Sequence, residues 1–147
     1  VKKFIIIPNK KWFDAKKDKT TIKQYKNKKI KYPIELVVFL LGDKWKFIIL
    51  CKLLKGTKRF GELEKSIGNI SSKVLTQQLK DLEAFGFVSR KTYDQIPPRV
   101  EYSVTEFGKT LIPIMKAMFD WGMEYRKEFD WIENLEIDKQ LKFPYAD

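Results

Sequence analysis

Glycines divide the central part of this sequence into short segments, and each segment carries apolar residues at the three- and four-residue spacing of one helix face. The segments cover residues 33–41, 43–55, 59–67 and 71–85, and the glycines that follow them are Gly42, Gly56, Gly68 and Gly86. Glycine commonly ends a helix because it adopts a left-handed backbone conformation without steric cost. The pattern therefore predicts four short helices that bury their apolar faces in one core.

Helix start signals support this division. Proline suits a first helical turn, as at Pro33, and the side chains of Asp43 and Ser71 are of the types that cap helix N-termini. Gly68 supplies a turn shortly before Ser71. The third helix, this turn and the helix that begins near Ser71 together predict a helix-turn-helix.

The helix expected from Ser71 has two chemically different faces. The apolar face carries Leu75, Leu79, Leu82 and Phe85. The polar face carries Ser72, Lys73, Thr76, Gln77 and Lys80. Amides, hydroxyls and basic side chains read base edges and contact phosphates in the DNA major groove. A solvated helix surface has a similar composition, but the position of this helix in a helix-turn-helix favours DNA reading.

Two segments rich in β-branched and aromatic residues follow, over residues 87–93 and 100–104, and they predict a β-hairpin. Because Pro97 and Pro98 stiffen the intervening loop, we expect Gln95 and Arg99 to point outward, beside a duplex backbone or in a minor groove. An ordinary surface hairpin is the alternative. Because the predicted hairpin directly follows a helix-turn-helix, we favour its interpretation as a wing.

Thr105 is expected to cap a last long helix that Pro113 interrupts or kinks. Its apolar stripe is wider than one small domain usually needs. The stripe consists of Phe107, Leu111, Ile114, Met115, Met118, Trp121 and Tyr125. The expected fold class is α+β, mainly α: a winged helix-turn-helix with a two-stranded wing and a C-terminal dimerisation helix.

The net charge of +11 is unevenly distributed. Residues 1–31 hold twelve lysines against Asp14 and Asp18, a net charge of +10, whereas residues 44–99 carry +7 and residues 100–147 carry −4. Clustered basic residues displace counterions from nucleic acid, so we expect the middle of the chain to face a polyanion. The lysine-rich arm is either a solvated basic tail or a strap that contacts DNA.

The absence of histidine and the presence of a single cysteine, Cys51, limit the possible chemistry. Ser/His/Asp and Cys/His catalysis, His/Cys zinc sites and an intramolecular disulfide are excluded, and no glycine-rich phosphate loop is present. We therefore expect no enzyme activity, no cofactor and no metal. Cys51 lies among apolar residues, which favours a buried structural thiol over a reactive one.

No apolar run is long enough to span a bilayer, so no membrane partner is expected. The expected location is the cytoplasm, with the DNA, or the nucleus if the source is a eukaryote.

Five motifs occur in an order and at a spacing consistent with one domain. They are Pro33-Ile34-Glu35, Gly42-Asp43-Lys44-Trp45, Lys58-Arg59-Phe60-Gly61-Glu62-Leu63, the stretch from Ile70 to Leu79, and the stretch from Pro97 to Thr105. Together they resemble the HxlR-type family of winged helix-turn-helix transcriptional regulators, and the resemblance covers about residues 32–122. We expect a lysine-rich arm over residues 1–31, the DNA-binding domain with its dimerisation helices over 32–125, and an acidic tail over 126–147.

The resemblance implies a homodimer, built from the first helix and the C-terminal helix, that places two recognition helices in successive major grooves of a pseudo-palindromic site. The candidate DNA-binding residues are Arg59, Ser71, Ser72, Lys73, Thr76, Gln77, Lys80, Gln95 and Arg99. The candidate dimer-interface residues are Ile34, Val37, Leu111, Ile114, Met118, Trp121 and Tyr125.

Tyr32 occupies a position just before the Pro-x-Glu motif where family members that sense electrophiles or oxidants carry a cysteine. Thiol sensing through this position is therefore not expected, and any small-molecule effector is left unidentified.

These observations predict a sequence-specific double-stranded DNA-binding transcriptional regulator. A low-specificity architectural nucleic-acid-binding protein driven by the basic arm is the main alternative. A dimeric adaptor that does not touch DNA is a further one.

Overall fold

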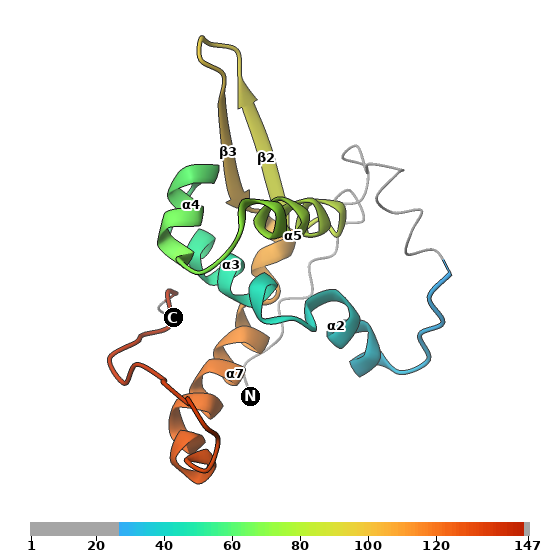
Figure 1. Ribbon diagram of the computed structural model, residues 1–147. Coiled ribbons are helices and arrows are strands. Elements are labelled where there is room, and N and C mark those ends of the chain that lie inside the picture. Colours follow the sequence, from blue (N-terminus) through green and yellow to red (C-terminus); the bar gives the residue numbers. More distant parts are fainter. Residues whose placement is uncertain (1–26, 146–147) are drawn as a thin grey trace.

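The computed structural model describes residues 27–145, so most of the lysine-rich arm and residues 146–147 lie outside the described part (Figure 1). Its elements are α2 (Pro33–Leu41), α3 (Lys44–Leu54), β1 (Lys58–Arg59), α4 (Phe60–Ile67), α5 (Ser72–Ala84), β2 (Val88–Tyr93), β3 (Arg99–Val104), α6 (Glu106–Lys109), α7 (Ile112–Tyr125) and the short 3-10 helix η2 (Arg126–Phe129). The β2–β3 hairpin projects from the helices at one end of the molecule, and α7 extends at the opposite end.

The four helices predicted from apolar spacing are α2 to α5. Gly42 ends α2 with a φ of −69° and not in the left-handed conformation expected of a terminating glycine. The Asp43 carboxylate accepts a hydrogen bond from the Lys46 amide at 3.0 Å, and the Ser71 hydroxyl oxygen accepts one from the Val74 amide at 3.2 Å. Gly86 follows α5 with a φ of 84°, a conformation that favours glycine. Local hydrogen bonding therefore fixes where the two longer of these helices, α3 and α5, begin.

The sheet has three antiparallel strands in the order β1-β3-β2. The β2–β3 hairpin confirms the predicted two-stranded wing. β1 was not predicted, because two residues are too few to show the alternating pattern of a strand. β1 forms by pairing with the other edge of β3, with Lys58 opposite Tyr102 and Arg59 opposite Glu101. This pairing fixes the wing to the start of α4.

Leucines from several helices form the core, in which α5 is firmly seated. The largest fully buried side chains are Leu41, Ile49, Leu50, Leu63, Leu75, Leu79, Leu82 and Val88. Burying each such side chain stabilises the fold by roughly 1.5–3 kcal/mol. Because α5 contributes three of them on one face, its opposite face is turned outward.

The C-terminal helix is broken into α6 and α7 rather than continuous. The Thr105 hydroxyl caps α6 by accepting a hydrogen bond from the Gly108 amide at 2.9 Å. Gly108 packs so closely on Phe87, the residue before β2, that a Cβ there would clash with the Phe87 carbonyl oxygen. Pro113 then stands in the first turn of α7, where its missing amide hydrogen costs nothing. The predicted interruption is confirmed and lies at the α6–α7 junction.

The acidic tail contains η2 and then no regular element in the described part. Phe143 nevertheless packs against the core, and its ring lies 5.7 Å from that of Phe119 on α7. Within residues 27–145, no helix has the length and apolar character needed to cross a bilayer.

Candidate nucleic-acid interface

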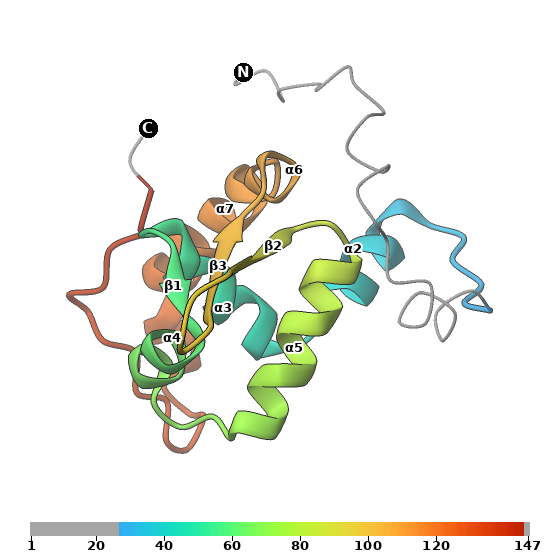
Figure 2. The ribbon, with the colours of Figure 1, turned by 90° about the horizontal axis from the view of Figure 1, so that it is seen from above.

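Three elements that a helix-turn-helix protein uses on DNA lie on one side of the molecule. Figure 2 looks onto this side and shows α4, α5 and the β2–β3 hairpin nearest the viewer. The polar candidates of this helix are all exposed: the N-cap residue Ser71, and Ser72, Lys73, Thr76, Gln77 and Lys80 of α5. All six are therefore accessible to a partner.

The hydroxyl groups at the start of α5 are engaged within the protein. Ser72 donates a hydrogen bond to the Glu64 carboxylate on α4, and Thr76 donates to the Ser72 carbonyl oxygen at 2.7 Å. Lys73 and Lys80 form no ion pair with any residue of the described part. The ammonium groups of these two lysines are consequently the charges that α5 offers to an anion.

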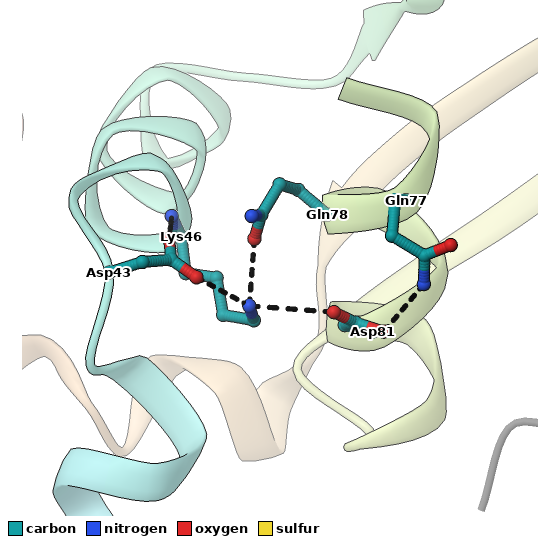
Figure 3. A network of polar contacts seen from close by, with 5 residues as sticks. All are labelled: Asp43, Lys46, Gln77, Gln78 and Asp81. Atoms are coloured by element: carbon teal, nitrogen blue, oxygen red, sulfur yellow. Dashed lines mark hydrogen bonds and ion pairs between the residues drawn. The ribbon is translucent and has the colours of Figure 1, made fainter. Parts of the chain in front are cut away.

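A buried polar network joins α3 to α5 (Figure 3). Lys46 is only 7% exposed, and its Nζ lies 2.8 Å from Asp43 Oδ2, 2.7 Å from Gln78 Oε1 and 3.5 Å from Asp81 Oδ2. Gln77 Nε2 donates to Asp81 Oδ1 at 3.0 Å. A charge can be buried at acceptable cost only when it is paired, so these contacts fix the position of α5 against α3.

This network was not predicted from the sequence. Lys46 falls within an apolar helix and Asp81 on the recognition helix, and nothing in their local spacing links them. Burial alone would raise the pKa of Asp43, but the hydrogen bonds and charge of Lys46 outweigh it and lower that pKa. The available signal was a charged residue on the buried side of an amphipathic helix, which needs a partner from another element.

Arg99 lies at the start of β3 and not at the tip of the wing, which differs from the outward position expected from the two prolines. Its guanidinium pairs with Glu101 and lies 5.1 Å from the ring centroid of Tyr93. Residues two apart on a strand share a face, which brings Arg99 and Glu101 together. The Arg99 hydrogen bond, with a smaller one from Tyr93, lowers the pKa of Glu101 despite the opposing effect of burial.

Two basic residues of the wing were not among the sequence candidates. Arg90 and Lys91 are exposed on β2, and successive strand residues point to opposite faces. Lys91 stands opposite Glu101 on β3 and lies 4.8 Å from the Tyr93 ring centroid. Their position in a predicted wing strand was the signal that could have identified them. Gln95 is exposed in the loop, as expected.

Arg59 lies at the junction of β1 and α4. Its side chain is exposed, and it stands opposite Glu101 in the sheet. It therefore links the surface of the wing to that of the helix-turn-helix.

The candidate dimer residues divide into exposed and buried groups. Ile34 on α2 is 73% exposed, and Met118, Trp121 and Tyr125 on α7 are 53%, 57% and 46% exposed. Val37 and Ile114 are partly buried against the core. Leu111 is itself a core residue and offers little surface to a partner, so its position does not fit the interface role.

Cys51 is half-buried, and burial raises the pKa of its thiol while the nearby Lys52 and Lys55 oppose the shift. A raised pKa lowers the thiolate fraction at a given pH and hence the nucleophilicity of the sulfur. This agrees with a structural thiol. Tyr32 is exposed at the start of α2, and residues 27–145 contain no group of three or more His, Cys, Asp or Glu side chains that could hold a metal ion.

The helix-turn-helix α4–α5, with its exposed polar face and the antiparallel hairpin that follows, defines a winged helix-turn-helix DNA-binding protein. The family model for the HxlR-like helix-turn-helix matches residues 40–130. The chain belongs to this family and is a DNA-binding transcriptional regulator, as the motifs predicted. The match begins within α2 and extends slightly past the region covered by the motifs.

Relatives and solved structures agree with this assignment. The HTH-type transcriptional regulator YdeP of Bacillus subtilis is 46% identical over 101 residues, which is 69% of this chain and 79% of the relative. The regulator YtcD of the same organism is 39% identical over 120 residues, 78% of this chain and 95% of the relative. The structure of the redox regulator HypR in its reduced form has a TM-score of 0.66 and 42% identity, and it covers 69% of this chain and all of that chain. The family and these relatives are transcriptional regulators, not enzymes.

Proposed function

We propose that this regulator acts as a homodimer on a pseudo-palindromic duplex site, with α5 in the major groove and the β2–β3 wing beside the duplex. The observation that supports this most strongly is the polar face of α5, which is exposed opposite three fully buried leucines. A two-fold dimer of helix-turn-helix units places its recognition helices one helical turn of DNA apart, or a multiple of it, so the site mirrors the symmetry of the protein.

The proposed contacts divide into phosphate binding and base reading. Lys73 and Lys80 neutralise phosphates, because their ammonium groups are exposed and form no ion pair in the described part. Gln77 reads a base edge, since an amide offers both a donor and an acceptor. The remaining contacts are proposed for the other residues of the surface: Arg59, Ser71, Ser72, Thr76, Arg90, Lys91, Gln95 and Arg99.

The proposed dimer surface combines α2 and α7. Ile34, Met118, Trp121 and Tyr125 leave large apolar areas exposed, and the Trp121 and Tyr125 rings lie 5.1 Å apart. Exposed apolar patches of this kind commonly mark protein–protein contacts. We propose that a second copy of the chain covers this surface.

Fluorescence anisotropy of a selected duplex and a scrambled duplex tests the function. Specific binding is expected to be at least ~10³-fold tighter than binding to the scrambled sequence. The same measurement on a chain that lacks residues 1–31, the whole arm, separates the two functional hypotheses. If the shortened chain still prefers the selected duplex, the folded domain recognises the sequence. Equal affinity for both duplexes, or loss of all binding when the arm is removed, would support the architectural alternative.

Replacing Lys73 with alanine is expected to weaken binding to every duplex alike. Because one phosphate contact is lost, the slope of log affinity against log salt should fall in magnitude by about one. Lys127→Ala is the matched control, since Lys127 is exposed on η2, outside the proposed interface. An unchanged salt slope for Lys73→Ala would remove this residue from the phosphate contacts.

Trp121→Glu is expected to convert the dimer into monomers in analytical ultracentrifugation, because it places a charge in an apolar contact that must be desolvated. Ile96→Glu is the matched control, since Ile96 is fully exposed in the loop of the wing, far from α7. If Trp121→Glu sediments as the wild type does, α7 is not the dimer surface.

A further inference from the structure

The side-chain amide of Gln77 is held in one orientation by a neighbour on the same helix. Gln77 Nε2 donates to Asp81 Oδ1 at 3.0 Å. A carboxylate only accepts hydrogen bonds, so the amide nitrogen must face Asp81 and the amide oxygen must face elsewhere. Figure 3 shows the Gln77 oxygen directed away from Asp81 and from the rest of the network.

Asp81 is itself fixed from outside α5. It is 7% exposed, and its other carboxylate oxygen, Oδ2, lies 3.5 Å from Lys46 Nζ on α3. Lys46 is in turn held by Asp43 at 2.8 Å and by Gln78 at 2.7 Å. The two carboxylate oxygens of Asp81 therefore contact different groups: Oδ2 lies near the buried ammonium of Lys46, and Oδ1 accepts a hydrogen bond from Gln77.

Gln77 is also a neighbour of both exposed lysines of α5. It lies four residues after Lys73 and three before Lys80, the spacing of neighbours on one side of a helix. With phosphate-binding lysines on both sides, its amide is the uncharged group best placed to reach a base edge.

We propose that Asp81 is a positioning residue that makes Gln77 present its carbonyl oxygen to the DNA, so that α5 selects a base carrying an exocyclic amine in the major groove. Adenine N6 and cytosine N4 are such donors, whereas guanine O6 and thymine O4 are acceptors that face the carbonyl unfavourably. A glutamine free to turn its amide would accept both kinds of base. This inference rests on the proposed placement of α5 in the major groove.

Adenine suits this arrangement best. Its N6 amine donates to the Gln77 oxygen, while its N7 accepts the amide hydrogen that Asp81 leaves unused. Cytosine offers the N4 donor alone. We therefore expect adenine first and cytosine second at one position of each half-site.

The Asp81→Asn variant distinguishes a residue that orients Gln77 from one that only stabilises the fold. Asparagine has one oxygen, and the ammonium of Lys46 attracts it, so the asparagine NH2 group faces Gln77. The Gln77 amide must then turn, accept from that NH2 group and present its own nitrogen to the DNA. The preferred base is expected to change from adenine or cytosine to guanine or thymine.

The readout is selection of bound duplexes from a random pool, followed by anisotropy on duplexes that differ at the selected position. The wild type is expected to prefer adenine over guanine by about tenfold, and Asp81→Asn should reverse the order. Gln77→Ala should lose the preference at this position and keep it elsewhere. Lys73→Ala is the control that weakens all duplexes without changing the ratio.

A second variant keeps the test decisive if Asp81→Asn folds poorly in circular dichroism. Lys46→Met combined with Asp81→Leu removes both charges together and leaves Gln77 free to turn, so adenine and guanine should bind within about threefold of each other. An unchanged adenine preference in either Asp81 variant overturns the inference, as does a wild-type preference for guanine or thymine at the position that depends on Gln77. If the wild type selects no sequence at all, the proposed function fails first.

Discussion

Lys46→Met is expected to lower the free energy of unfolding by about 3 kcal/mol, because it leaves the carboxylates of Asp43 and Asp81 without the cation that pairs them. Lys46 is 7% exposed and lies between α3 and α5, so water compensates little for the lost contacts. Urea denaturation measures the change, with an unchanged slope and a lower midpoint.

Two further variants test whether the loss of stability comes from the unpaired buried charge and not from the replacement of a lysine as such. Lys44→Met, on the exposed residue two positions earlier, should cost less than about 1 kcal/mol, since it loses only a contact with the Trp45 ring. Lys46→Met with Asp81→Leu should recover much of the loss, because the buried carboxylate of Asp81 is then removed, and the Asp43 carboxylate that stays behind is 40% exposed to water. A single variant as stable as the wild type would show that the network does not hold α5 in place.

Leu75→Ala is expected to destabilise the protein by about 3 kcal/mol, because Leu75 is fully buried and its truncation leaves a cavity beneath the recognition helix. In a domain of this size, the midpoint of thermal unfolding should fall by about 10–20 °C. The neighbouring Val74 is 36% exposed, and Val74→Ala should change stability by less than about 0.5 kcal/mol.

The Leu75→Ala variant also distinguishes an effect on stability from an effect on the recognition of DNA bases. Its polar face is that of the wild type, so its base preferences should be retained at temperatures where it is folded. Equal stability of the Leu75→Ala and Val74→Ala variants would contradict the assignment of the buried face of α5.

The wing carries less free positive charge than its sequence suggests. Arg99 is paired with Glu101, and Glu101 also stands opposite Arg59 and Lys91 in the sheet. One carboxylate thus lies among three basic side chains. The acid orients these residues but lowers the net positive charge of that face of the wing, whereas Arg90 is exposed on the opposite face of β2.

The helices, the hairpin and the family follow from local patterns of residues. Asp43 caps α3 and Ser71 caps α5 through atoms three residues along the chain, and contacts of that range are encoded in adjacent residues. The leucine spacing of α5 likewise identified both of its faces. Most DNA-binding candidates on α5 could therefore be named before the structure was seen.

The way these elements constrain one another depends on packing between segments far apart in the chain. Lys46 and Gln78 are 32 residues apart, β1 exists only through pairing with β3, and Leu111 is buried only because α7 packs on the core. The orientation of the Gln77 amide also depends on Asp81, whose position is set by a lysine on another helix. A residue's local pattern shows which face it occupies, but the partner it meets there depends on how distant segments pack.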